Sequence, residues 1–411
     1  MDKPGIVQLA WKDADLGAVD LPGGRMAIGS GFGSGLAIRP GDPPGIVWAV
    51  CDRGPNLKIK TMVERFGVDS LQRLAGSSGA KIMPRLDLGP ALARLRVGTT
   101  DIELIEEIRL ATPDGRPLPG LPLPGGEHAT REPALSLEGE DLGSDPAGAD
   151  TEGVAALGGG GFWLADEYGP SLLRVDGEGR LLLRWVPEGD EAALEGCGYD
   201  VAGVIPAIAG RRQLNRGFEA LALSPDERWL WVAFQSPLAH PDEDAHRSAR
   251  HVRLWKLHSR SGQVEAQFLY PLDPPVSFGR DSVGERVDWS DLKVSEITIA
   301  GEGALLVLER ASKTTKIYKV APSADRELGR EHLDIATRPT VEEMSGAGTL
   351  SLPVLHKTLL FSTDDAPDVA PDLEGMAMLS PTELLLVSDN DFGVEGAETC
   401  FYRLTLLRPA W

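Results

Sequence analysis

The chain has 411 residues, a formal net charge of −21 and a hydrophobic fraction of 42%, with 48 Gly and 31 Pro. The hydrophobic content is sufficient for a packed core, so the chain is not intrinsically disordered. The acidic balance argues against a nucleic acid or an anionic membrane as a partner, because both require a basic face. The many Gly and Pro residues are typical of short strands joined by turns, and one all-β domain over 1–411 fits this length.

The cysteines and the start of the chain say little about the cellular compartment of the protein. Cys51, Cys197 and Cys400 are too few and too far apart for a disulfide framework or a metal finger. No segment has the length and apolarity of a membrane span. Met1-Asp2-Lys3-Pro4 contains no apolar leader, so we expect a cytoplasmic protein as written, or a periplasmic or secreted one if a leader was removed. The sequence does not indicate an oligomeric state.

In chain order, five stretches repeat one pattern of two short apolar strands that end at polar residues. The clearest copy runs from Glu152-Gly153-Val154-Ala155 through Phe162-Trp163-Leu164-Ala165 to Asp166. Two further strands, which end at Trp185, complete a four-stranded unit. The repeat units lie near 34–56, 152–185, 219–257, 296–320 and 374–404.

Repeated units of short strands predict radial repetition about one axis, which is the β-propeller fold. The first interval is longer than the others, and alternating apolar residues there predict a divergent blade within 85–139. Five visible units and one hidden unit give a six-bladed all-β propeller. The alternative interpretation is that these are ordinary strands whose acids are turn residues, but recurrence in five copies favours a shared polar centre.

Polar residues recur where the first strand begins and where the second strand ends. The first positions are Ser34, Glu152, Glu219, Glu296 and Glu374, and the second are Asp52, Asp166, Gln235, Glu309 and Asp389. Small residues beside the acids would let the innermost strands approach one another, and several carboxylates facing one channel repel each other unless a cation is present. Calcium prefers such oxygen ligands. We predict a calcium site with the ligands Asp52, Glu152, Glu219, Glu296, Glu374 and Asp389.

Several motifs, in the same order, resemble those of the phytase-like family, which is usually described as the "esterase-like activity of phytase" domain. They are Asp150-Thr151-Glu152-Gly153, Asp166-Glu167-Tyr168-Gly169-Pro170, Asn215-Arg216-Gly217-Phe218-Glu219, Gln235-Ser236-Pro237-Leu238, Leu306-Val307-Leu308-Glu309-Arg310 and Ser388-Asp389-Asn390-Asp391-Phe392-Gly393. The resemblance extends from about Ser34 to Leu404. It implies a propeller that hydrolyses esters or phosphate esters at an acidic centre. Ser34 and Gln235 depart from the acids of the other units, which weakens the metal contribution expected from their blades.

The expected partner is a small-molecule ester or phosphate ester. The predicted catalytic residues are Glu152, Asp166, Glu167, Glu219, Glu309 and Arg310, and the predicted substrate contacts are Arg53, Tyr168, Gln235 and Asn390. A metal offsets the charge of a phosphate ester and activates water, and Arg53 and Arg310 could clamp its oxygens. The alternative for both arginines is an ion pair with the neighbouring acids, and the alternative for Tyr168 is a structural cap on its blade.

Two functions therefore remain open. There is no Gly-x-Ser-x-Gly motif and no histidine in a repeated position, which disfavours a Ser-His-Asp hydrolase. The first function is a calcium-dependent hydrolase. The second is a non-catalytic binding propeller with a structural metal, which is favoured by Ser34, by Gln235 and by the lack of an obvious general base.

Overall fold

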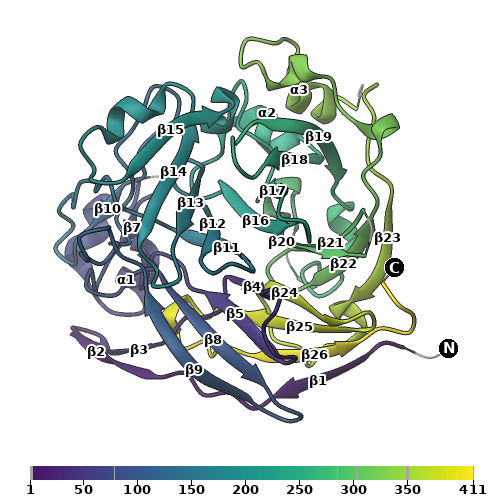
Figure 1. The fold of residues 1–411 in the computed structure, drawn as a ribbon. Coiled ribbons are helices and arrows are strands. Elements are labelled where there is room, and N and C mark those ends of the chain that lie inside the picture. The colour runs from purple at the N-terminus through teal and green to yellow at the C-terminus, as the bar shows by residue number, and fades with distance from the viewer. Residues whose placement is uncertain (1–2, 78, 285, 302, 349–350, 411) are drawn as a thin grey trace.

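The computed structural model describes residues 3–77, 79–284, 286–301, 303–348 and 351–410. Five sheets surround a common axis, and their innermost strands meet at the centre (Figure 1). These innermost strands are β4 (Gly35–Ala37), β11 (Thr151–Ala156), β16 (Phe218–Leu223), β20 (Lys293–Ala300) and β24 (Leu373–Ser380). Each contacts the next in this order and β24 contacts β4, so the ring is closed. The chain is an all-β propeller, as predicted.

Each blade adds its strands outward from the axis. Blade 1 continues from β4 through β5 (Ile46–Val50), β8 (Ala91–Val97) and β9 (Ile102–Arg109). Blade 2 continues from β11 through β12 (Phe162–Asp166), β13 (Ser171–Val175), β14 (Leu181–Pro187) and β15 (Asp200–Ile205). The strands within these two blades pair antiparallel, except that β15 runs parallel to β14.

The other three blades have four strands each. Blade 3 continues from β16 through β17 (Trp229–Phe234), β18 (His251–His258) and β19 (Val264–Pro271). Blade 4 continues from β20 through β21 (Ala304–Arg310), β22 (Thr315–Val320) and β23 (Lys357–Ser362). Blade 5 continues from β24 through β25 (Glu383–Ser388), β26 (Phe401–Thr405) and β1 (Gly5–Leu9). Because β1 pairs with β26, both ends of the described chain are held in one blade.

The number of blades differs from the prediction. The described residues form five blades, and 85–139 does not form a sixth. Its two clear strands, β8 and β9, are the outer strands of blade 1, and β8 pairs directly with β5. The first interval is long because residues 51–90 separate the second and third strands of this blade and residues 110–150 separate β9 from β11. We call residues 51–90 the blade 1 insertion.

Shorter elements lie outside the strands of the five blades. The blade 1 insertion contains β6 (Leu57–Lys58), α1 (Ile59–Glu64) and β7 (Lys81–Ile82), and β7 also pairs with β10 (Ala134–Leu135). A hairpin joins β2 (Asp15–Leu21) and β3 (Gly24–Gly29), and the described residues also form the helices α2 (Glu243–Ser248) and α3 (Val341–Gly346). Short 3-10 helices lie at Asp69–Leu74, Asp190–Leu194, Ala207–Arg211, Pro275–Ser277, Trp289–Asp291, Ala324–Arg326, Arg330–Leu333, Thr363–Asp365 and Asp391–Gly393.

The core lies between the faces of neighbouring blades. All five residues of β5 are buried, as expected for a strand that is covered on both faces. The innermost strands approach closely where the sequence has glycine. A Cβ atom on Gly35 would lie 2.4 Å from the carbonyl oxygen of Glu152, and one on Gly153 would lie 2.6 Å from that of Glu219. These positions explain why a small residue follows the acid in several repeats.

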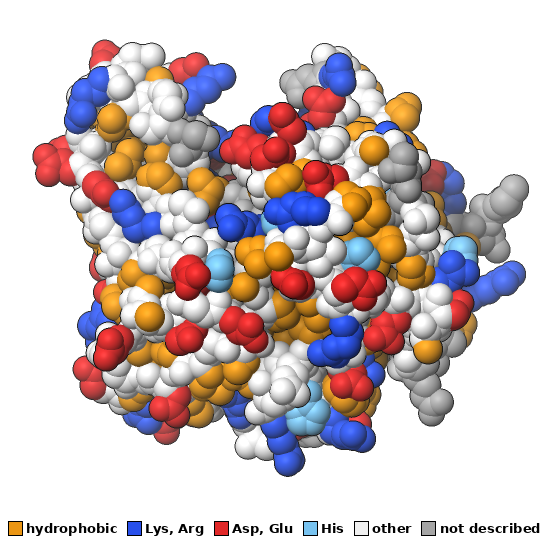
Figure 2. Space-filling model, turned by 90° about the horizontal axis from the view of Figure 1, so that it is seen from above, with side chains coloured by type: hydrophobic (Ala, Val, Ile, Leu, Met, Phe, Trp, Pro, Cys, Tyr) orange, Lys and Arg blue, Asp and Glu red, His pale blue; other side chains and the backbone are white. Residues whose placement is uncertain are grey.

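The surface seen from above mixes acidic, basic and hydrophobic side chains (Figure 2). The net charge of −21 is therefore not gathered into a single acidic patch on this face. Among the described residues, no helix has the length and apolarity required to cross a membrane. Met1 and Asp2, which begin the stretch used to assess a leader, lie outside the described residues.

Candidate active site and metal centre

A cavity of about 700 Å³ lies at one end of the propeller axis, and every blade contributes charged or polar side chains to it. The residue at or just after the end of each second strand lines this axial cavity. In blade order these residues are Asp52, Glu167, Gln235, Arg310 and Asp389. The blade 1 insertion adds a wall that contains Lys58, Lys60 and Lys81. The end of the second strand therefore faces the axial cavity, at the predicted residue in blades 1, 3 and 5 and one residue later in blades 2 and 4.

Three glutamates from the innermost strands of blades 2, 3 and 5 meet in this cavity. Carboxylate oxygens of Glu152, Glu219 and Glu374 lie within 4.8 Å of one another, and we call these residues the acidic triad. Each lies in a β-bulge, where the pairing with the second strand is interrupted. A bulge leaves its extra residue unpaired and redirects the side chain. Three separate blades thus direct a glutamate into one space.

The environment of the acidic triad disfavours its ionised form. Burial raises the pKa of Glu152 well above its usual range, and the charges of Asp150 and Glu219 raise it further. Burial also raises the pKa of Glu219, against the opposing effect of Lys293 and Arg310. Close carboxylates with raised pKa values either share protons or bind a cation.

Glu296 does not join the acidic triad, which corrects its prediction as a metal ligand. The bulge of β20 lies between Val294 and Glu296, so Ser295 is the equivalent of the triad glutamates. The carboxylate of Glu296 instead accepts hydrogen bonds from the backbone N–H of Leu36 at 3.2 Å and of Ile297 at 3.0 Å. Burial raises its pKa well above the usual range, and the backbone hydrogen bonds oppose this effect. This carboxylate fills the axis beneath the cavity.

Two predicted catalytic carboxylates lie away from the axial cavity. Asp166 forms a buried ion pair with Arg184 at 3.2 Å, and Glu309 forms one with Lys357 at 2.5 Å. Successive residues of a strand point to opposite faces, so the residue after each of these acids faces the cavity instead. The structure therefore corrects both predictions by one residue and gives Asp166 and Glu309 structural partners within the blades.

Arg53 lines the cavity but is surrounded by acids, which is the ion-pair alternative considered from the sequence. Its guanidinium forms ion pairs with Asp150, with Glu167 at 3.3 Å and with Glu132 at 3.5 Å. The same group lies 4.9 Å from the ring centre of Tyr168. The hydroxyl of Tyr168 donates a hydrogen bond to a backbone carbonyl at 2.8 Å. Tyr168 is therefore placed as a structural cap rather than as part of the cavity lining.

Arg310 connects two blades at the cavity wall. Its Nε donates a hydrogen bond to Ser295 Oγ at 2.8 Å, and its guanidinium forms ion pairs with Asp372 at 2.8 Å and with Glu374. Arg310 is thus the direct neighbour of the acidic triad. Both arginines predicted to clamp a phosphate already have carboxylate partners.

A second acidic group lies beside the triad. Carboxylate oxygens of Asp52, Asp389 and Asp391 lie within 4.8 Å of one another. Burial raises the pKa of Asp52 well above its usual range, and the charge of Asp389 adds to the effect. Burial and the charge of Asp391 raise the pKa of Asp389 to about 7. Asp52 and Asp389 were predicted as ligands, and the structure brings them together with Asp391.

Buried oxygens that lack partners mark the same cavity. Within the described part of the chain, the following oxygens are buried without a hydrogen-bond partner: Glu167 Oε1, Glu219 Oε2, Gln235 Oε1 and Asn390 Oδ1. Buried polar atoms are normally hydrogen bonded. These oxygens are the donors that calcium prefers, and they accompany several carboxylates; Arg53 Nε is a further unpartnered atom of the lining. The donor set therefore fits a hard cation.

A family model described as "Phytase-like: Esterase-like activity of phytase" matches residues 29–392. The chain belongs to the phytase-like family. This confirms the resemblance seen in the sequence motifs, and it suggests a hydrolase-type β-propeller with acidic clusters at its centre. The phytase-like chain is also 27% identical, over 348 residues, to an uncharacterized secreted protein of Arthroderma benhamiae. That match covers 75% of this chain and 64% of the length of the relative.

Solved structures similar to this phytase-like chain include three proteins with different names. The PQQ-bound aldose sugar dehydrogenase of Streptomyces coelicolor is 11% identical, with 98% of each chain covered and a TM-score of 0.32. The Cps50 (Swd1) β-propeller domain of Myceliophteria thermophila is 9% identical, with 96% of this chain and 99% of that chain covered and a TM-score of 0.35. Virginiamycin B lyase of Staphylococcus aureus is 10% identical, with 98% and 99% covered and a TM-score of 0.33. Because these identities and TM-scores are low, we assign no functional residue of this chain from these structures.

Sequence reasoning missed several residues that line the axial cavity. Asp391 lies in a quoted motif, directly after the predicted Asn390, and its position offered a signal. Lys293 and Arg216 also line the cavity. Arg216 lies in a motif without an assigned role, and Lys293 precedes the bulge of β20, where no repeated acid draws attention to it.

Proposed function

We propose that this phytase-like propeller is a calcium-dependent hydrolase of phosphate esters or other esters, and that the axial cavity is its active site. The observation that carries the proposal is the convergence of Glu152, Glu219 and Glu374 within 4.8 Å. Family membership supports the reaction class. The acidic composition supports a small-molecule substrate rather than a nucleic acid or an anionic membrane.

Calcium would be held by the acidic triad, with Asp52 and Asp389 beside it. The unpartnered Glu219 Oε2 supports this assignment, because a buried carboxylate oxygen without a donor requires a cation or a proton. When bound, calcium would supply positive charge next to the ester and would lower the pKa of a coordinated water.

Glu167 is the proposed general base. One of its oxygens, Oε2, is held by Arg53 at 3.3 Å, whereas Oε1 has no hydrogen-bond partner among the described residues. Burial, followed by the charge of Glu219, raises its pKa well above the usual range. A base with a raised pKa accepts a proton from water more readily than an ordinary carboxylate. Addition of that water across the ester bond gives an acid and an alcohol.

The proposal is tested by hydrolysis assays on purified protein that is first stripped with EDTA and then titrated with calcium. The substrates are a phosphomonoester, a phosphodiester and a carboxylester. We expect turnover to disappear with EDTA and to return with calcium, and we expect Glu219→Gln and Glu374→Gln to require more calcium. Failure of every substrate class, with calcium present and the protein folded, contradicts the proposal.

The second candidate is a non-catalytic binding propeller in which the metal is structural. The ion pairs of Arg53 and Arg310 favour it, because neither arginine is free to clamp a substrate. In that case Glu219→Gln lowers the melting temperature while ligand binding at the cavity persists and no turnover is found.

We also propose that the protein is secreted. The support is the relative from Arthroderma benhamiae, which is described as a secreted protein. Fractionation of the native host, with detection of the protein by antibody, tests this. Recovery of the mature protein from the cytoplasm alone would contradict it.

A further inference from the structure

We propose that Arg216 and Lys293 form an anion subsite in the axial cavity and that it holds the phosphoryl group of a phosphate ester. The inference rests on the proposed function, because it assigns the substrate class of that same cavity. It does not use the arginines singled out from the sequence, since Arg53 and Arg310 already have carboxylate partners.

Lys293 begins β20, and its backbone pairs with that of Arg310 at the cavity wall. Within the described part of the chain, its ammonium group forms no ion pair. Burial, and then the charges of Arg310 and Arg216, lower its pKa to about 8, while Glu219 and Glu167 oppose this effect. Lys293 is thus a cation with cationic neighbours, and its position favours an anionic ligand.

Arg216 is held next to Lys293 by the backbone. Its Nη1 donates a hydrogen bond to the carbonyl oxygen of Leu292, the residue before Lys293, at 3.4 Å. Burial lowers the pKa of Arg216, although Glu167 opposes the effect. Like Lys293, it has no ion pair among the residues that the structure describes. Two half-buried cations therefore line the cavity side by side without carboxylate partners among the described residues.

The loop that carries Arg216 is fixed rather than free. Asn215 adopts a positive φ of 56°, and its backbone N–H donates to Glu132 at 2.8 Å. Its side chain accepts a hydrogen bond from Arg53. On the other side, a Cβ on Gly217 would lie 2.2 Å from the carbonyl oxygen of Glu167. The backbone on both sides of Arg216 is thus held in place, so its guanidinium is presented to the cavity from a rigid turn.

Two unpaired cations beside the acidic triad fit a phosphoryl group better than a carboxylester. A phosphate dianion has oxygens for both a metal and the cations, and charge-assisted hydrogen bonds are the strong ones. A carboxylester carries no charge, so its binding would leave Arg216 and Lys293 uncompensated. The cavity, at about 700 Å³, also has room for a phosphate group together with its alcohol.

The test measures binding of inorganic phosphate by isothermal titration calorimetry, with calcium present, to the wild type and to Lys293→Met, Arg216→Met and Lys293→Arg. Lys319→Met is the matched control, since Lys319 is a half-buried lysine on β22 outside the cavity lining. We expect each methionine variant to weaken phosphate binding by about tenfold or more, which is the range for a charged hydrogen bond. Lys293→Arg retains most of the affinity, and Lys319→Met remains within about twofold of wild type. Acetate binds much more weakly than phosphate.

Three results would overturn the subsite: unchanged phosphate affinity in both methionine variants, no phosphate binding by a wild type that still binds calcium, or equal affinity for acetate. Circular dichroism establishes that each variant is folded, and Lys293→Arg distinguishes the loss of charge from general disruption. Phosphate binding that depends on Arg216 and Lys293 without hydrolysis of any ester supports the subsite and contradicts the hydrolase instead. The two proposals therefore fail in different ways.

Discussion

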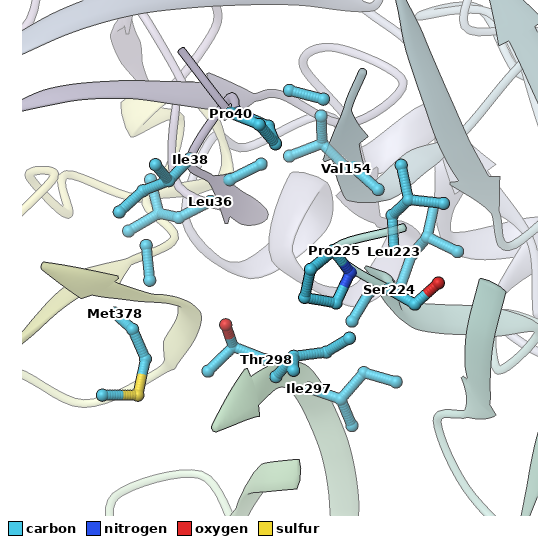
Figure 3. Close-up of a pocket in the computed structure, with 17 residues that line it drawn as sticks. Leu36, Ile38, Pro40, Val154, Leu223, Ser224, Pro225, Ile297, Thr298 and Met378 are labelled. Atoms are coloured by element: carbon cyan, nitrogen blue, oxygen red, sulfur yellow. The ribbon is translucent and has the colours of Figure 1, made fainter. Parts of the chain in front are cut away.

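The two ends of the propeller axis have opposite chemistry, although the same innermost strands form both. The axial cavity at one end is lined by carboxylates, arginines and lysines. The pocket at the other end, about 230 Å³, is lined mainly by apolar side chains, including those of Leu36, Val154, Leu223 and Met378 (Figure 3). The position of a residue along its strand, rather than the identity of the blade, decides which chemistry it meets.

Glu296 lies between these two ends. Four innermost strands have Gly or Ala at the equivalent position, namely Gly35, Gly153, Ala220 and Gly375, whereas β20 has a glutamate. Its carboxylate binds backbone N–H groups of β4 and β20 and is fully buried. A single side chain thus fills the space left by small residues and separates the charged cavity from the apolar pocket. The catalytic proposal therefore concerns only the polar end of the axis.

The largest expected effect follows from removal of the proposed base at the polar end. Glu167→Gln keeps the shape but loses the free carboxylate oxygen, so hydrolysis should fall by about 100-fold or more. Calcium binding, measured by calorimetry, should weaken less than in Glu219→Gln, because Glu167 lies outside the acidic triad. Glu265→Gln, at an exposed position of β19, is the control. Turnover within about threefold of wild type would remove Glu167 from the catalytic proposal.

The next effect concerns the boundary between the two ends. Glu296→Ala leaves the buried N–H groups of Leu36 and Ile297 without their acceptor, and each such loss costs about 1–3 kcal/mol. We expect the free energy of unfolding to fall by about 3 kcal/mol in urea titrations. Glu296→Gln keeps an acceptor oxygen, so its free energy of unfolding should fall by less than that of Glu296→Ala. Equal stability of Glu296→Ala and wild type would contradict the role of this side chain at the axis.

Stability should also depend on pH through the acidic clusters. Burial raises the pKa of Asp150 to about 6, and burial with Asp391 raises that of Asp389 to about 7. A carboxyl group whose folded pKa is raised contributes stability that is present at low pH and is lost as pH rises through the folded value. Calcium-free protein should therefore melt at lower temperature at pH 8 than at pH 5, by scanning calorimetry.

Calcium should reverse this trend, because it binds the ionised carboxylates. At about 100 times its dissociation constant a ligand stabilises the folded state by about 2.7 kcal/mol. The gain in melting temperature should thus be larger at pH 8 than at pH 5, and magnesium at the same concentration is the control. A calcium shift that is equal at both pH values would contradict the placement of the ion among these acids.

The smallest effect is expected at the apolar end. Met378 is half-buried in the apolar pocket, so Met378→Ala should cost about 1 kcal/mol of unfolding free energy, less than truncation of a fully buried methionine. Turnover and calcium affinity should remain at wild-type values, because the pocket lies beyond Glu296. A loss of turnover in this variant, with stability intact, would contradict the claim that the two ends of the axis act separately.

The repeat was visible in the sequence because strand pattern and acid recur together, and this was sufficient to predict the propeller. The blade count was wrong because the insertion after β5 separates β8 and β9 from their own blade, and no local signal distinguishes two outer strands from a new unit. β-Sheet pairing is set by contacts distant in sequence, which composition does not reveal.

The lining of the axial cavity was predicted to within one residue at most positions. Glu152, Glu219 and Glu374 are where the repeat indicated, whereas Glu296 was aligned in place of Ser295. A bulge adds one residue without any change in composition, and a shift of one residue moves a side chain to the opposite face. An offset of one residue in the other direction selected Asp166 and Glu309, although the residues that follow them, Glu167 and Arg310, line the cavity.

The most direct test of the account is a crystal structure determined from crystals grown with calcium. We predict a strong anomalous peak in the axial cavity, with oxygens of Glu152, Glu219 and Glu374 at about 2.3–2.6 Å. A map from crystals grown at saturating calcium that shows well-ordered density for these three carboxylates and no ion between them would contradict the account.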